Sequence, residues 1–300
     1  MNGEGPQRFV IFIFAAIFFL MGLFISCGFN DTIYPPFHVD VNYTIKHTDL
    51  KKWSGRDSYV SVQGKESMTM QCRNCALVTS SGRILGSGAG HEIDHTECVI
   101  RMNDAPTTGY ESDVGSRTTL RVVGHSSVSY VFRNPNEFLR RTDSHPVIIF
   151  WGPPYKIRKD PKAAFYGSLQ RVSMTYRDIS YFTVTPSKML RFDDLFLRET
   201  GYDRDQSHSW LSTGWFTMVI AIEICDNIKV YGMVPPNHCG TPGIKKVRYH
   251  YYDRWWVDEC ATFFQHENRR SQGQHRFITE KRVFARWAKQ YNITFTHPRW

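Results

Sequence analysis

Short runs of apolar residues, each ending in small or turn-forming residues, recur along the chain. They predict buried strands over 75–78, 97–102, 119–123, 147–151 and 181–184. Runs of this length, bounded by glycine, proline or polar clusters, are typical of strands covered on both faces. Residues 215–225 are apolar on nearly every side, which predicts a buried helix, and 227–233 return as a strand. Strands alternating with helices favour an α/β fold with a mostly parallel sheet.

The predicted helix over 215–225 follows Ser212, Thr213 and Gly214. Serine and threonine are favoured helix N-caps, because their side-chain oxygens accept hydrogen bonds from the free N–H groups of the first turn. Those N–H groups and the positive end of the helix dipole also form a ready site for an anion. From these residues alone, the segment is either an anion site or the capped start of a core helix.

A glycine-spaced loop, Gly86-x-Gly88-x-Gly90, lies between the first two predicted strands. Ligands of open α/β sheets bind outside the carboxyl ends of the strands, where glycine N–H groups can approach a phosphate closely. The spacing is not the G-x-G-x-x-G dinucleotide fingerprint, and no convincing helix opens directly on it. Nucleotide binding and an ordinary surface loop therefore both remain open.

Residues 9–26 form an uncharged and almost entirely apolar run. Its 18 residues are at the lower end of the length that spans a bilayer, and exceed the apolar stretch of a usual signal peptide. Arg8 precedes the run, and no Lys or Arg occurs in 27–45, which places the N-terminus in the cytoplasm. We expect a type II signal anchor, with a cleaved signal peptide as the alternative.

This topology predicts four parts of the chain. A cytoplasmic tail covers 1–8 and the transmembrane anchor covers 9–26. A polar lumenal stem, which contains Pro35-Pro36 and no sustained period, covers 27–71. The lumenal catalytic domain covers 72–300.

A lumenal location would explain two further features of the sequence, its glycosylation sequons and its cysteines. Sequons at Asn42 and Asn292 predict N-glycosylation, which needs a secretory compartment. Six of the seven cysteines lie in 72–300, the expected catalytic domain, and an even number in an oxidising space favours disulfides. Cys72-x-x-Cys75 also has a spacing found in metal and redox sites, but no Cys/His cluster completes a zinc site.

The chain carries a net charge of +9. This excess suits an anionic partner, such as nucleic acid, an anionic membrane or a small anionic substrate. No zinc-finger, RNP or homeodomain-like pattern accompanies the charge, so we expect no nucleic-acid partner.

Four stretches carry a pattern that is far more specific than the glycine loop. They are Cys75-Ala-Leu-Val…Ser81-Gly82…Arg101-Met102-Asn103-x-Ala105-Pro106…Asp113-Val114-Gly115, then Ser212-Thr213-Gly214…Cys225-Asp226…Val230-Tyr231-Gly232, then His250-Tyr251-Tyr252-Asp253, and finally His275-x4-Glu280. In this order they resemble the large, small, third and very small motifs of the eukaryotic sialyltransferases, glycosyltransferase family 29. Finer features, such as Leu-Ser-Thr-Gly-Trp-Phe-Thr-Met from Leu211, resemble the N-acetylgalactosaminide α-2,6-sialyltransferases, especially types V and VI.

The resemblance implies a fold and a setting. The fold would be a single Rossmann-like, mostly parallel sheet flanked by helices, a variant of the GT-A type, behind a transmembrane helix and a short stem. The protein would be held in the Golgi membrane by its N-terminal anchor, with the catalytic domain in the lumen. Its donor substrate would be CMP-sialic acid.

The resemblance also implies roles for individual residues. His275 would be the base that takes the proton of the acceptor hydroxyl, a task that suits histidine near neutral pH. His250, together with the helix N-terminus at 212–214, would stabilise the negative charge on the leaving CMP phosphate. Glu280 would orient its surroundings rather than react. The nearby His266 has no acid at the motif spacing, and we expect no catalytic role for it.

Donor contacts are implied at Ser81, Gly82, Asn103, Ser212, Thr213 and Gly214. Ser80 stands where many members have Asn, so we expect one cytidine or ribose contact to differ. The cysteines of the large and small motifs imply a disulfide between Cys75 and Cys225.

A metal is a separate question. Asp203-Arg204-Asp205 has the Asp-x-Asp spelling with which many nucleotide-sugar transferases hold a divalent ion on a diphosphate, and Asp193-Asp194 offers another pair. Short acidic pairs are common in loops. CMP-sialic acid has no diphosphate, and the resemblance implies metal independence, so we expect no metal and no cofactor.

The type V/VI resemblance implies transfer to the 6-hydroxyl of GalNAc in a sialylated Neu5Ac-α2,3-Gal-β1,3-GalNAc acceptor, on ganglioside GM1b to give GD1α. The same transfer onto O-linked glycans of glycoproteins is the alternative acceptor. From other classes, the chain could be an inactive Golgi glycan-binding relative or a nucleotide-dependent oxidoreductase. The intact motif residues argue against the former, and only the glycine loop favours the latter.

Overall fold

The computed structural model describes residues 50, 58–64, 67–139, 146–157, 164–268 and 274–300. The apolar run at 9–26, the sequon at Asn42 and most of the expected stem lie outside these residues. In the described part of the chain, no helix has the length and apolar character needed to cross a membrane.

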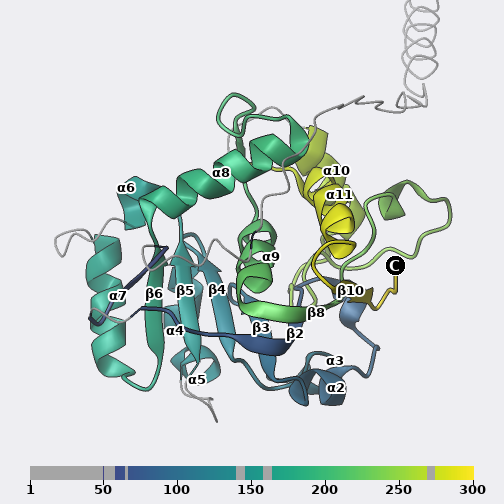
Figure 1. Cartoon of the computed structure of the whole chain (residues 1–300). Helices are drawn as coiled ribbons and strands as arrows, with labels where there is room; N and C mark the ends of the chain where they lie inside the picture. Colours follow the sequence, from purple (N-terminus) through teal and green to yellow (C-terminus); the bar gives the residue numbers. More distant parts are fainter. Residues whose placement is uncertain (1–49, 51–57, 65–66, 140–145, 158–163, 269–273) are drawn as a thin grey trace, which may run out of the picture. The chain divides into compact units, whose positions relative to one another are not determined.

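An eight-stranded sheet forms the centre of the domain, in the order β1-β6-β5-β4-β3-β2-β8-β10 (Figure 1). The strands are β1 Tyr59–Ser61, β2 Cys72–Val78, β3 Cys98–Met102, β4 Leu120–Gly124, β5 Val147–Trp151, β6 Ser180–Val184, β8 Cys225–Tyr231 and β10 Ile293–Thr296. Neighbouring strands run parallel except at one edge, where β1 pairs antiparallel with β6. The predicted α/β fold with a mostly parallel sheet is confirmed.

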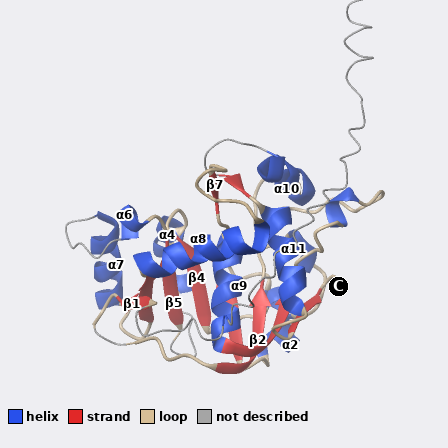
Figure 2. Ribbon diagram, turned by 45° about the horizontal axis from the view of Figure 1, so that its top comes forward, coloured by secondary structure: helices blue, strands red, loops and turns tan. Residues whose placement is uncertain are grey.

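Helices cover both faces of the sheet (Figure 2). One face packs against α8 Pro186–Thr200, α9 Thr213–Ile224 and α11 Phe277–Ala288. The other packs against α2 Gly90–Asp94, α3 Glu111–Val114, α4 Val128–Arg133, α5 Pro135–Phe138 and α7 Ala164–Thr175. Alternation along each strand separates the two cores, because successive side chains of a strand point to opposite faces. In β4, for example, Val122 belongs to the first core and Val123 to the second.

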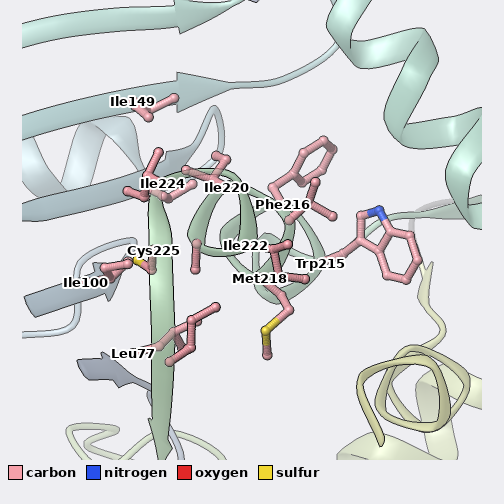
Figure 3. Close-up of a cluster of buried hydrophobic side chains, with 14 of the residues drawn as sticks. Leu77, Ile100, Ile149, Trp215, Phe216, Met218, Ile220, Ile222, Ile224 and Cys225 are labelled. Atoms are coloured by element: carbon pink, nitrogen blue, oxygen red, sulfur yellow. The ribbon is translucent and has the colours of Figure 1, made fainter. Parts of the chain in front are cut away.

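Helix α9 is buried all round, as its sequence predicts. Every residue from Trp215 to Ile224 is buried, because the helix lies between the sheet on one side and α8 and α11 on the other. Figure 3 shows its side chains together with Leu77, Ile100 and Ile149 of the strands. The ring of Trp215 packs edge-on against Phe196, at 5.2 Å between centroids, and lies 5.0 Å from Trp287.

Three disulfides join the six cysteines of the described domain: Cys72–Cys98, Cys75–Cys225 and Cys239–Cys260. Disulfide bonding of these six cysteines is therefore confirmed, and Cys75–Cys225 is the pairing that the resemblance implies. This bond links the adjacent strands β2, which opens the first of the four motif stretches, and β8, which closes the second. In the chain-entropy model, closing so long a loop stabilises the fold by about 4–5 kcal/mol.

The folded domain begins before residue 72, the boundary expected from the sequence. Tyr59–Ser61, inside the expected stem, form the edge strand β1, and the ring of Tyr59 is buried. A strand of three residues carries too short an alternating pattern to be recognised from the sequence. Its position depends on β6, which offers a free edge to pair with.

An ion pair is fully buried between α8 and α9. The Lys188 ammonium contacts one carboxylate oxygen of Glu223, and the Tyr59 hydroxyl donates to the other at 2.8 Å. The Lys188 and Glu223 side chains are 1% and 0% exposed. Removing one charge leaves the other without its counter-ion in a medium of low polarity.

We predict that Lys188→Met destabilises the domain by about 3–5 kcal/mol, since it leaves Glu223 buried without its counter-ion. Urea unfolding, followed by circular dichroism, measures the effect. The matched control is Arg198→Ala, which removes the exposed pair between Arg198 and Asp194 and costs less than about 1 kcal/mol. Equal effects of the two substitutions would contradict the prediction.

Candidate active site

A cavity of ≈ 160 Å³ lies at the carboxyl ends of β2 and β3, where α9 and α11 begin. Every residue predicted to act in catalysis or donor binding, except Gly82, lines it: Ser81, Asn103, Ser212, Thr213, Gly214, His250, His275 and Glu280. These residues come from all four sequence motifs and are up to about two hundred positions apart. The topology thus brings the four motifs together at the carboxyl ends of the strands, where α/β folds bind ligands.

Asn103 joins the end of β3 to the start of α9. Its side-chain oxygen accepts from the N–H of Gly124 at 2.9 Å, and its amide nitrogen donates to the hydroxyl of Thr213 at 3.3 Å. The residue has a positive φ of 47°, which Asn tolerates better than most residues. The buried guanidinium of Arg121 donates to the Asn103 carbonyl at 2.8 Å and holds this conformation.

The N-terminus of α9 faces the cavity. Ser212 is its N-cap, with the hydroxyl oxygen accepting from the N–H of Trp215 at 3.1 Å. The N–H groups of Thr213 and Gly214 belong to the first turn, which has no acceptor inside the helix. Both residues line the cavity, so this end of the helix can bind an anion there.

Glu280, on α11, is hydrogen-bonded to the same cap. One carboxyl oxygen accepts from the Ser212 N–H at 2.8 Å, and the other contacts the Ser212 hydroxyl. Burial raises the pKa of Glu280 to about 8, although the hydrogen bonds from Ser212 act in the opposite direction. Glu280 is therefore neutral near pH 7, and it fixes the start of α9 rather than offering a free charge.

His275 lies beside the cavity on the two-residue strand β9, Gln274–His275, which pairs with β7, Ser209–Trp210. Its Nδ1 is 2.9 Å from the carbonyl oxygen of Trp210. A carbonyl only accepts, so Nδ1 carries the proton and Nε2 holds the free lone pair. Burial lowers the pKa of His275, which keeps the ring neutral at physiological pH. The ring therefore has the protonation state of a general base.

His250 reaches the cavity from the loop that precedes α10, Glu259–Asn268. Its Nδ1 is 3.1 Å from a carboxylate oxygen of Asp253, and its main-chain N–H donates to the other oxygen at 3.0 Å. Burial alone would raise the pKa of Asp253, but the bonds and charge of His250 outweigh it and lower the pKa. The ionised Asp253 orients the His250 ring so that Nδ1 donates to it.

Gly82 and the glycine loop make contacts within the chain, whereas the sequence suggested a donor contact at Gly82 and nucleotide binding at the loop. Gly82 is absent from the cavity wall; its N–H donates to the carbonyl of Arg248 at 3.0 Å, and a β-carbon would lie 2.6 Å from that oxygen. The N–H groups of Gly86 and Gly88 both donate to the carboxylate of Asp113 at 2.9 Å. The glycine loop thus binds a carboxylate of its own chain, and α2 begins directly at Gly90.

Two buried ionisable residues of the cavity wall, Glu259 and Lys281, were not identified from the sequence. The hydroxyl of Ser81 donates to Glu259 at 2.5 Å, and Arg83 lies 3.4 Å from its other oxygen. The ammonium group of Lys281 lies 3.5 Å from the centroid of Phe263. Burial lowers the pKa of Lys281 to about 8. In the sequence, the only feature that could have pointed to Lys281 is its position directly after the motif residue Glu280.

The acidic pairs lie away from the cavity wall. Asp203 accepts from the N–H of Asp205 at 2.8 Å, which closes a local turn, and Asp193 is paired with Arg204 at 2.7 Å. Their carboxylates are thus engaged in local structure. The sequon residue Asn292 is exposed at the start of the edge strand β10, where a glycan would have room.

We predict that Glu280→Gln flattens the pH dependence of stability. With a folded-state pKa of about 8 against an ordinary 4.5, Glu280 keeps a proton that the unfolded chain releases. The free energy of unfolding should therefore fall by up to about 1.4 kcal/mol per pH unit as pH rises from about 5 to about 7.5. Glutamine cannot titrate but still accepts from Ser212. Denaturant unfolding at several pH values tests this; equal slopes for the variant and the wild type would refute it.

Comparison with known proteins identifies relatives over the whole chain. Residues 30–291 match the model of glycosyltransferase family 29 (sialyltransferase). The alpha-N-acetylgalactosaminide alpha-2,6-sialyltransferase 6 of Homo sapiens is 48% identical, over 100% of this chain and 90% of its own. The human alpha-N-acetyl-neuraminyl-2,3-beta-galactosyl-1,3-N-acetyl-galactosaminide alpha-2,6-sialyltransferase is 44% identical, over 81% of this chain and 80% of its own.

Among solved structures, a mammalian sialyltransferase in complex with Gal-beta-1-3GalNAc-ortho-nitrophenol aligns at 23% identity with a TM-score of 0.47. The alignment covers 75% of this chain and 69% of that one. The match to the family model and the 48% identity over the whole chain are sufficient to assign the family. The chain belongs to glycosyltransferase family 29, the sialyltransferases.

Proposed function

We propose that the enzyme transfers sialic acid from CMP-sialic acid, with inversion at the anomeric carbon and His275 as the base. The observation that carries this proposal is the hydrogen bond from Nδ1 of His275 to the Trp210 carbonyl. It leaves Nε2 as a proton acceptor in a cavity that also contains the start of α9 and His250. A base and two anion-stabilising groups are the parts that the displacement requires.

In the proposed reaction, the acceptor oxygen attacks the anomeric carbon as Nε2 of His275 takes the hydroxyl proton. The bond from that carbon to the phosphate oxygen breaks, and CMP leaves with the electron pair. The N–H groups at the start of α9 and the ring of His250 meet the negative charge that develops on the phosphate. Asn103 and Ser81 contact the nucleotide, while Glu280 holds Ser212 in place.

The acceptor is proposed from the relatives. We infer α-2,6 transfer to GalNAc of a Neu5Ac-α2,3-Gal-β1,3-GalNAc unit, because the relatives named above carry these linkages in their names. Ganglioside GM1b, giving GD1α, is the acceptor that the sequence resemblance favours. The net charge of +9 suits an acceptor that is itself anionic.

The setting completes the proposal. The enzyme is a single-pass type II protein of the Golgi membrane, with both the stem and the catalytic domain in the lumen. It works without a metal, since the donor has no diphosphate to bridge and both acidic pairs lie away from the cavity wall.

We predict that His275→Ala lowers kcat by about 10²- to 10⁴-fold, the usual share of a general base, and leaves CMP binding largely intact. A radiolabelled transfer assay and calorimetric titration with CMP measure the two effects. His91→Ala is the control, because His91 is an exposed histidine away from the cavity wall and should keep full activity. Retention of most activity by His275→Ala would remove His275 as the base.

We predict that transfer continues in EDTA and is faster to GM1b than to the same trisaccharide unit on an O-glycosylated protein. The full chain, incubated with CMP-sialic acid and each acceptor in turn, gives both answers. Loss of activity in EDTA, restored by Mg²⁺ or Mn²⁺, would contradict metal independence. Faster transfer to the glycoprotein would overturn the lipid acceptor, and a chain that binds no CMP would overturn the donor.

A further inference from the structure

His266 lies directly against the histidine that serves as the proposed base. Its Nδ1 accepts a hydrogen bond from the main-chain N–H of His275 at 3.2 Å. The two rings are stacked, with centroids 5.7 Å apart and planes inclined by 10°. His266 belongs to α10, whereas His275 is on β9, so the contact links two separate elements. The sequence gave no reason to place His266 beside the base, because no acid follows His266 at the spacing of the His-x4-Glu motif.

His275 is consequently held from two sides. The Trp210 carbonyl accepts from the ring at Nδ1, and His266 accepts from the main chain. The ring of Phe277 packs against both histidines, at 5.1 Å from His266 and 5.2 Å from His275. Since β9 has only two residues, its pairing with β7 supplies few hydrogen bonds, and the bond to His266 adds one more to its main chain.

The next residue along α10 fixes the helix that follows the base. The carboxylate of Glu267 accepts from the N–H of Ile278 at 2.9 Å, and its carbonyl accepts from Arg276 at 2.6 Å. It also contacts the hydroxyl of Thr279. His266 and Glu267 therefore form one anchor, in which Glu267 holds the start of α11 and His266 holds the residue that carries the reacting nitrogen.

We propose that His266 is a positioning residue for catalysis, which aligns the proposed base by accepting the His275 N–H at Nδ1. The inference rests on the function proposed above, in which Nε2 of His275 takes the acceptor proton. His266 itself touches no substrate in this scheme, and it is not among the residues that line the cavity. Its contribution is geometric, because proton transfer requires the base to lie within hydrogen-bond reach of the hydroxyl.

Three substitutions separate hydrogen bonding from packing. His266→Asn keeps an acceptor close to the position of Nδ1. His266→Gln places its amide one carbon further out, towards the position of Nε2. His266→Phe keeps a ring that can stack with His275 and Phe277, but it has no acceptor for the N–H.

The experiment measures kcat, the KM for CMP-sialic acid, the Kd for CMP and the melting temperature of the full chain for each variant. We expect His266→Phe and His266→Gln to lower kcat about tenfold, the effect of one lost hydrogen bond, while KM and Kd stay within about twofold. His266→Asn should retain kcat within about twofold of the wild type. This rescue would not follow from a purely structural role of the ring.

Several results would overturn the inference. These are an unchanged kcat in His266→Phe, an equal loss in His266→Asn and His266→Phe, or a loss that follows the melting temperature or the affinity for CMP. The His275→Ala variant, assayed in parallel, keeps this failure distinct from failure of the proposed function. An active His275→Ala refutes the base itself, whereas an inactive His275→Ala with a fully active His266→Phe refutes only the positioning role.

Discussion

The arrangement of the site depends on the buried hydrogen bonds between the Glu280 carboxyl group and Ser212. They join α11 to the cap of α9 across 68 positions of sequence. With Glu280 only 2% exposed, an ionised carboxylate would be costly, and burial raises its pKa to about 8. The two carboxyl oxygens accept from the N–H and the hydroxyl of Ser212, and a neutral carboxyl group does so without bringing a charge beside the anion site.

This bond acts on a rigid support. Helix α9 is buried on every side, so its N-terminus cannot shift without disturbing the packing of Trp215 and Phe216 against the neighbouring layers. Beside it, at the end of β3, the buried guanidinium of Arg121 donates to the carbonyls of Asn103 and Ala105, at 2.8 and 3.1 Å. Hydrophobic burial thus sets the position of α9, and hydrogen bonds to backbone carbonyls set the position of Asn103.

The cavity wall combines both signs of charge. Glu259, which accepts from Ser81, and Lys281 are buried on neighbouring helices, α10 and α11. Burial raises the pKa of Glu259 and lowers that of Lys281 to about 8, so Lys281 is cationic near neutral pH. For the proposed donor, which carries a phosphate and a carboxylate, the Lys281 cation and the N-terminus of α9 supply charge of the opposite sign, while Glu259 is paired with Ser81 and Arg83.

The sequence alone predicted the central strands and the buried helix over 215–225, because apolar periodicity and capping are local. The residues of the four motifs came from the resemblance to the sialyltransferases, not from these local patterns. The sequence did not predict β1, whose three residues gain their structure by pairing with β6. Nor did it assign the glycine loop to Asp113, Gly82 to the Arg248 carbonyl, or His266 to His275. Those contacts join segments between 9 and 166 residues apart, so only tertiary packing decides which acceptor each N–H group meets.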